Sequence, residues 1–78
     1  MRVVLYSREG CHLCDVARDV ILAERSGTAF AFDEVDIGGD DGLELEYGIR
    51  VPVVEIDGLE RFEVEVDAAR FAALVRDG

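Results

Sequence analysis

Apolar residues at the start of the chain change their spacing from a strand-like to a helix-like period. Residues 2–6 form a short apolar, β-branched run bounded by Ser7 and Gly10, which predicts a buried strand. Between residues 11 and 25, apolar side chains recur at steps of three and four with charged residues between them, which predicts an amphipathic helix. Gly27 follows this segment, as expected of a residue that ends a helix.

The middle of the chain predicts a second strand and then a short element of ambiguous type. Aromatic and β-branched residues favour a strand over residues 29–36, and a loop rich in glycine and aspartate covers residues 38–42. In residues 43–47, apolar residues alternate with glutamate. This alternation fits either a strand or a one- to two-turn helix closed by Gly48, because so short a segment does not settle its own period.

The last third of the chain predicts a hairpin followed by a helix. Residues 51–56 and 59–66 are two β-branched runs around an Asp-Gly pair, which is typical of a tight hairpin turn. The second run alternates apolar and charged residues, so we expect a half-buried strand at the edge of the sheet. Asp67 can cap the amphipathic helix that follows, and this helix is expected to end at Gly78.

The order of these elements predicts a single α/β domain over residues 1–78. The first strand, helix and strand form a parallel pair, because the helix has to cross over between the strands. The hairpin and the last helix follow, so we expect a four-stranded mixed sheet with helices over both faces. Pro52 lies at the start of a strand that looks central, where its missing N–H removes a ladder donor.

Composition and charge narrow the function classes. Half of the residues are hydrophobic and a third are charged, which is typical of a globular protein rather than a disordered one. The net charge of −10 argues against partners that carry phosphate, whether nucleic acid or an anionic membrane surface. Most acids lie in residues 33–67, which hold 13 acids and 2 arginines. We interpret this segment as a solubilising surface. The alternative is that its charge influences which partners bind.

The sequence shows no signal for export or membrane insertion. No apolar run approaches the roughly 18 residues of a transmembrane helix. The first residues lack the length and the small-residue cleavage site of a signal peptide. We therefore expect a cytoplasmic monomer, in which a pair of cysteines is more often redox-active or metal-binding than part of a secretory disulfide framework.

The Cys-His-Leu-Cys motif at residues 11–14 carries the clearest chemistry. Residues three apart share a helix face, so the two sulfurs can join in a small ring. Cys11 lies at the start of the predicted helix, where unpaired N–H groups and the helix dipole stabilise a thiolate, and Arg8 adds positive charge. Cys14 lies one turn further in and suits the resolving role in thiol–disulfide exchange.

Two other interpretations of the motif stay open. A closed zinc site needs four ligands, and the chain offers two cysteines and His12. A metal or iron–sulfur site would therefore need the cysteines of a second subunit or an outside ligand. The other interpretation is that the domain is an interaction module whose thiols have no redox role. His12 is either an exposed polar residue or a group whose partial positive charge tunes the thiolate.

The sequence over residues 3–14 is Val-Val-Leu-Tyr-Ser-Arg-Glu-Gly-Cys-His-Leu-Cys. This segment resembles the first strand and active-site turn of glutaredoxins. Residues 51–53 resemble the cis-proline segment of that family, and the element order matches over essentially the whole chain. The similarity is greatest to small glutaredoxin-like proteins with a Cys-x-Leu-Cys motif. It implies a thioredoxin-like fold in which Pro52 is cis and faces the cysteines, leaving the Val51 backbone open to pair with an extended substrate.

Several positions depart from the glutaredoxin pattern. His12 stands where the family usually has proline, Arg8 replaces the usual lysine, and Arg50 replaces the usual threonine before the Val-Pro pair. In glutaredoxins a Gly-Gly turn and the start of the last helix hold a glutathione carboxylate on backbone N–H groups. This chain lacks that turn, and we expect Asp67 to cap these N–H groups itself and to repel the anion.

The resulting prediction is a thiol–disulfide oxidoreductase in which Cys11 attacks a disulfide and Cys14 releases the product. No bound cofactor is expected, and the use of glutathione is doubtful. The expected partners are a disulfide-bearing protein or small molecule and a thiol reductant or reductase. The residues expected to contact the substrate are Arg8, His12, Arg50, Val51 and Pro52.

Overall fold

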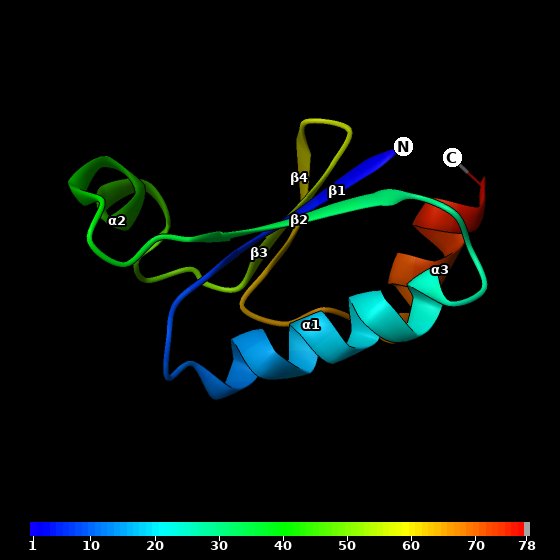
Figure 1. Cartoon of the computed structure of the whole chain (residues 1–78), viewed down its shortest axis with the longest axis horizontal. Helices are drawn as coiled ribbons and strands as arrows, with labels where there is room; N and C mark the ends of the chain where they lie inside the picture. Colours follow the sequence, from blue (N-terminus) through cyan, green and yellow to red (C-terminus); the bar gives the residue numbers. More distant parts are fainter. Residues whose placement is uncertain (78) are drawn as a thin grey trace.

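A mixed four-stranded sheet forms the centre of the protein in the computed structural model, which describes residues 1–77 (Figure 1). The sheet order is β2-β1-β3-β4; β1 is parallel to β2, and the other two neighbouring pairs are antiparallel. This arrangement confirms the predicted sheet. The end that was expected for the last helix, at Gly78, lies outside the described residues. The elements are β1 (Arg2–Ser7), α1 (His12–Arg25), β2 (Ala31–Asp36), α2 (Asp41–Tyr47), β3 (Val53–Ile56), β4 (Leu59–Glu63) and α3 (Ala68–Asp77).

Helices α1 and α3 cover one face of the sheet and enclose the core (Figure 1). Successive side chains of a strand point to opposite faces, so Val3 and Leu5 of β1 both point into this core and are fully buried. Phe71 of α3 is also fully buried, and its ring meets Phe30 edge-on at a centroid distance of 5.9 Å. The buried cluster consists of Val3, Leu5, Ala17, Ile21, Phe30, Val54, Ile56, Phe62, Phe71 and Val75.

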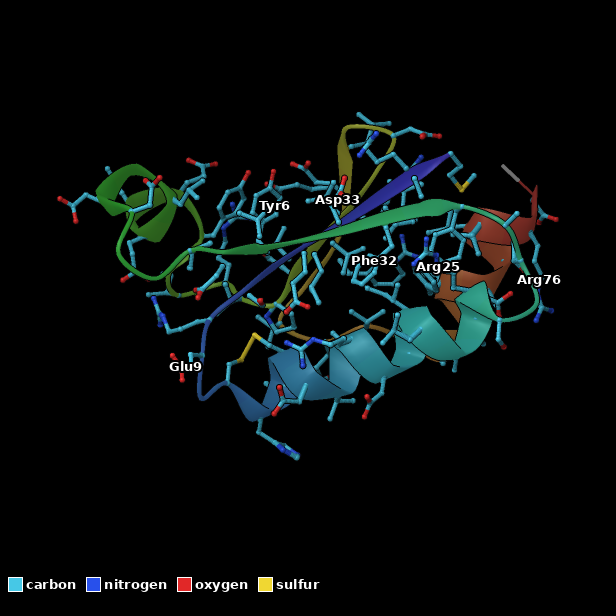
Figure 2. The ribbon with its side chains drawn as sticks, in the orientation of Figure 1. Tyr6, Glu9, Arg25, Phe32, Asp33 and Arg76 are labelled. Atoms are coloured by element: carbon cyan, nitrogen blue, oxygen red, sulfur yellow. A yellow bond between two sulfur atoms is a disulfide. The ribbon has the colours of Figure 1, made fainter. Side chains whose placement is uncertain are left out.

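The opposite face of the sheet is covered by a helix only at one end. Tyr47 of α2 stacks on Tyr6 there, with ring centroids 4.2 Å apart. In Figure 2, Tyr6 and Asp33 lie on the side of the sheet away from α1, whereas Phe32 lies on the α1 side. Burial is the main cause that raises the pKa of Tyr6 to about 12, and a hydrogen bond with the neighbouring Tyr47 is the second. This phenol therefore stays neutral. Tyr6 therefore serves as a packing residue.

The ambiguous segment after the second strand is helical. Asp40 caps α2, because its side-chain oxygen accepts the Leu43 N–H at 3.0 Å. Gly48 closes the helix by donating its N–H to the Glu44 carbonyl at 2.8 Å. The alternation of apolar residues, which fitted a strand as well as a short helix, does not reflect burial, since Leu45 is 90 % exposed.

The edge strand is shorter than predicted. The expected strand over residues 59–66 stops at Glu63, because Val64 adopts a left-handed backbone with φ +69° and turns the chain away from the sheet. The Val64 N–H donates to the carbonyls of Arg50 at 3.0 Å and Pro52 at 2.8 Å instead of to a ladder partner. Pro52 itself precedes β3, so its missing N–H removes no bond from the ladder.

Glu34 of β2 ties the end of β1 to α1 through hydrogen bonds. Ser7 donates its hydroxyl to Glu34 Oε2 at 2.7 Å, and Arg18 of α1 donates Nε to Oε1 at 2.7 Å. The hydrogen bond from Arg18, opposed by partial burial, holds the pKa of Glu34 below its usual range. A carboxylate with a depressed folded-state pKa stabilises the fold above its unfolded pKa, and this contribution is lost as the pH falls through the folded value.

We expect Arg18→Gln to lower the thermal midpoint at pH 7 by more than it does at pH 3. Protonation of Glu34 removes the carboxylate that the guanidinium binds, so the deficit should shrink as the pH falls below about 4.5. Arg61→Gln is the control for loss of one positive charge, since no ion pair of Arg61 is found in the described part of the chain. A deficit that is constant from pH 7 to pH 3 would contradict this role of the pair.

Candidate active site

The two cysteines meet in the first turn of α1, where they form a disulfide with Cα atoms 5.2 Å apart. Figure 2 shows this bond in yellow at the start of the helix, next to the loop that carries Glu9. Cys11 is the N-cap residue of α1, and its sulfur accepts the Cys14 N–H at 3.1 Å. Cys11 is partly exposed, whereas Cys14 is fully buried beside Ala17. The first cysteine is thus open to solvent in part, and the second is shielded.

The segment before β3 is held in place by α2 and by the chain that follows β4. The Val51–Pro52 peptide bond is cis, and Pro52 is buried. Val51 donates its N–H to the Tyr47 carbonyl at 3.1 Å, because the last carbonyls of α2 lack partners within the helix. The expectation of an open Val51 backbone is therefore wrong for its N–H. The Val51 carbonyl accepts no backbone hydrogen bond from the other residues that the structure describes.

Arg8 is paired with an acid of α2. Its Nη2 atom lies 2.6 Å from Glu44 Oε1, and its Nε donates to the same oxygen at 3.2 Å. The positive charge expected near Cys11 is therefore balanced by a carboxylate. Sequence reasoning missed this partner because Glu44 lies in the segment whose period was ambiguous. His12, between the cysteines, is exposed.

Arg50 is held by acids from two elements. Its guanidinium donates to Glu60 at 2.9 Å and Glu63 at 3.2 Å, and it lies 3.5 Å from Glu46. Hydrogen bonding to Arg50 holds the pKa of Glu60 below its usual range. The observed contacts of Arg50 are thus internal: they fasten the segment before Val51 to β4 and α2.

A hydrogen bond joins the connection from β4 to α3 to the segment before β3. Val64 donates to the carbonyl of Pro52, as described above, so this connection is bonded to the proline segment. Asp67 caps α3, because its Oδ1 accepts the Arg70 N–H at 3.1 Å, and this expectation is confirmed. The alternating residues after Phe62 concealed the turn at Val64, because nothing but its backbone angle marks it.

Residues 1–77 contain neither a cluster of metal ligands nor a membrane-spanning helix. No group of three or more His, Cys, Asp or Glu side chains in this range is placed to hold a metal ion. None of the helices in the same range is long and apolar enough to cross a bilayer.

These features define a class of protein. A Cys-x-x-Cys pair at the N-cap of α1, a proline directly before β3 and the β2-β1-β3-β4 sheet together describe a thioredoxin-like fold with its dithiol motif. Within this class, the chain belongs to the glutaredoxin-like domain family (DUF836), whose pattern matches residues 2–76. The resemblance to small glutaredoxin-like proteins is thereby confirmed.

Individual relatives agree with this assignment. The uncharacterized protein Rv0508 of Mycobacterium tuberculosis is 34% identical over 77 residues, covering 92% of this chain and 79% of that protein. The X-ray structure of the structural-genomics target protein XcR50 from X. campestris is 39% identical, with a TM-score of 0.81 and 97% of each chain covered. A thioredoxin mutant from Halobacterium salinarum, 23% identical with a TM-score of 0.68, covers 97% of this chain and 72% of its own; it shares the fold.

Proposed function

We propose that the protein is a thiol–disulfide oxidoreductase that uses Cys11 and Cys14 as a dithiol pair. One observation carries this proposal: the partly exposed residue Cys11 caps α1 and its sulfur accepts the Cys14 N–H at 3.1 Å, while Cys14 is fully buried. A helix start with an N–H directed at sulfur stabilises the thiolate, which is the attacking species in disulfide exchange.

The two cysteines have separate roles in this mechanism. The Cys11 thiolate attacks one sulfur of the substrate disulfide, forms a mixed disulfide and releases the other substrate sulfur as a thiolate, which takes up a proton. Cys14 then loses its proton and attacks Cys11, which releases the second substrate thiol. The substrate disulfide gains two electrons and two protons, and the protein ends with the Cys11–Cys14 disulfide. An external thiol reductant or reductase returns it to the dithiol, which suits a reducing, cytoplasmic setting.

The segment around Pro52 forms the substrate-facing side in this proposal. The Val51 carbonyl, which has no backbone partner among the described residues, would accept a main-chain N–H from an extended substrate. His12 lies exposed between the two cysteines and would face the same substrate. Arg8 and Arg50 act indirectly, because their ion pairs hold the neighbouring loops.

A single-turnover assay tests the proposed function. The protein is reduced with dithiothreitol, freed of reductant and mixed with 2-hydroxyethyl disulfide, a small uncharged disulfide. We expect both cysteine thiols to disappear together, as measured by alkylation and intact-mass spectrometry. A dithiol that stays reduced over hours, at pH 7 to 8, would refute the proposal. A coupled assay that offers glutathione or a thioredoxin reductase as electron donor then identifies the class of reductant.

We expect oxidised glutathione to bind weakly, with a dissociation constant above about 1 mM. Asp67 occupies the α3 N–H group that would bind a carboxylate, and Glu65 adds a second negative charge to the same connection. A titration followed by two-dimensional NMR should show no saturating shifts of residues 66–69. Saturable binding there at micromolar concentration would contradict the prediction. An Asp67→Asn variant, which keeps a capping oxygen but loses the charge, should bind more tightly.

A further inference from the structure

A groove runs from the redox motif along α1. It has a volume of about 520 Å³, which is within the range of sites that hold a small ligand or a side chain. Leu13 and Val16 of α1 form one wall, and Val64 and Val66 of the β4–α3 connection form the other. Phe62 also lines the groove. In Figure 1 the connection, in orange, passes alongside α1.

The groove reaches the Cys-x-x-Cys motif through Leu13. Leu13, which lines the groove, directly precedes Cys14 and lies two residues after Cys11 in the chain. On the other wall, Val64 donates its N–H to the Pro52 carbonyl at 2.8 Å, which joins that wall to the proline segment. A chain whose cysteine is bonded to Cys11 could therefore place a neighbouring side chain in the groove.

The walls are apolar and unusually open to solvent. Leu13 is 40 % exposed, Val16 44 % and Val64 42 %, although each lies beside the others in one concave surface. Concave apolar surfaces of this kind are more often binding sites than scattered exposed residues are. An apolar side chain that filled the groove would remove these three from water.

The charged residues of the groove favour a cationic occupant. Glu65 and Asp67 line it, and both belong to the acidic stretch over residues 33–67. Arg70 is the single basic residue among the lining residues that the structure describes, and its guanidinium lies over the Phe62 ring at 5.4 Å. An approaching polypeptide therefore meets carboxylates at the rim, which attract lysine or arginine.

We propose that this groove selects polypeptide disulfides in which an apolar residue and a basic residue lie next to the cysteine. The inference rests on the proposed function and adds a substrate class to it. The apolar side chain fills the space between Val16 and Val64, and the basic side chain pairs with Glu65. Cys11 exchanges with the substrate cysteine as described above, so the chemistry needs no further reactant.

Three synthetic peptide disulfides test the proposal. They are the symmetrical dimers of acetyl-Leu-Cys-Lys-amide, acetyl-Gly-Cys-Lys-amide and acetyl-Leu-Cys-Glu-amide. We expect the reduced protein to react with the Leu-Lys dimer about ten-fold faster than with the Gly-Lys dimer. We expect it to react about three-fold faster than with the Leu-Glu dimer at low salt, with this second advantage falling as salt is added.

Two pairs of variants locate the effect. Val16→Glu should reduce the Leu-to-Gly rate ratio to near one, whereas Leu22→Glu should not, because Leu22 is equally exposed at 45 % but does not line the groove. Glu65→Lys should abolish the preference for lysine over glutamate. Asp77→Lys, the same charge change at the far end of α3, should leave that preference intact.

A binding measurement separates the groove from the chemistry. Acetyl-Leu-Ser-Lys-amide, which cannot exchange, should shift the NMR signals of Val16, Val64 and Val66 in the oxidised protein. Equal rates for all three dimers, or equal ratios in Val16→Glu and the parent, would overturn the groove proposal while leaving the oxidoreductase intact. A dimer of the protein that Val16→Glu dissociates would assign the groove to a second copy and overturn it as well. No reaction with any disulfide would overturn both proposals.

Discussion

Cys11→Ser is expected to abolish exchange with small disulfides, whereas Cys14→Ser should still attack them. The reason is position: Cys11 is partly exposed at the N-cap of α1, and Cys14 is fully buried. Without Cys14 the mixed disulfide on Cys11 has no internal thiol to resolve it, so the variant should stall as a stable adduct. Intact-mass spectrometry detects the adduct, and we expect a loss of at least about a hundred-fold in rate for Cys11→Ser.

The alkylation rates of the two single variants near pH 6 provide the control. The thiol left in Cys14→Ser should react much faster with iodoacetamide than the thiol left in Cys11→Ser, because it is both more ionised and more accessible. The opposite order would mean that the roles are reversed. Slow alkylation of both thiols would support the alternative of an interaction module with idle cysteines.

Phe71→Ala is expected to cause the largest loss of stability of any substitution considered. The Phe71 side chain is fully buried, and its ring contacts Phe30 at 5.9 Å and Phe62 at 6.3 Å between centroids. Truncating a buried phenylalanine usually costs about 3–5 kcal/mol, because apolar burial is lost and a cavity remains. Since small domains have a free energy of unfolding of only about 5–15 kcal/mol, the variant should unfold at a much lower urea concentration than the parent.

Urea denaturation followed by circular dichroism measures this effect. Leu22→Ala is the control, because Leu22 is 45 % exposed and its truncation should cost less than about 1 kcal/mol. A Phe71→Ala midpoint close to that of the parent would show that α3 contributes little to the core.

Sequence pattern predicted the elements well wherever one face of the element is buried. The run before Ser7 and the helix after Cys11 were identified because their apolar residues really do point into the core, as Leu5 and Ile21 show. The pattern failed where apolar residues are exposed. Leu45 and Val64 imitate a strand period, but a cap makes one segment helical and a left-handed backbone ends the other.

The chemistry of the site was more predictable than its electrostatics. A Cys-x-x-Cys motif and the preference of asparagine, aspartate and serine for caps are local properties, so the sequence alone indicated Cys11 at the helix start and Asp67 as a cap. The Arg8 partner Glu44 is 36 positions away, and Glu60, to which Arg50 donates, is 10 positions away. Such pairings depend on how the elements pack, and no local pattern encodes them.

Four N–H groups near the motif share one property: they are already used inside the protein. Val51 donates to Tyr47, Val64 to Pro52, Arg70 to Asp67, and Cys14 to the sulfur of Cys11 in the disulfide form. Beside these four donors, the Val51 carbonyl and the carboxylates are acceptors open to a visiting molecule. At these acceptors the substrate has to supply the hydrogen-bond donor. A peptide backbone or an ammonium group can do so, and an ionised carboxylate cannot.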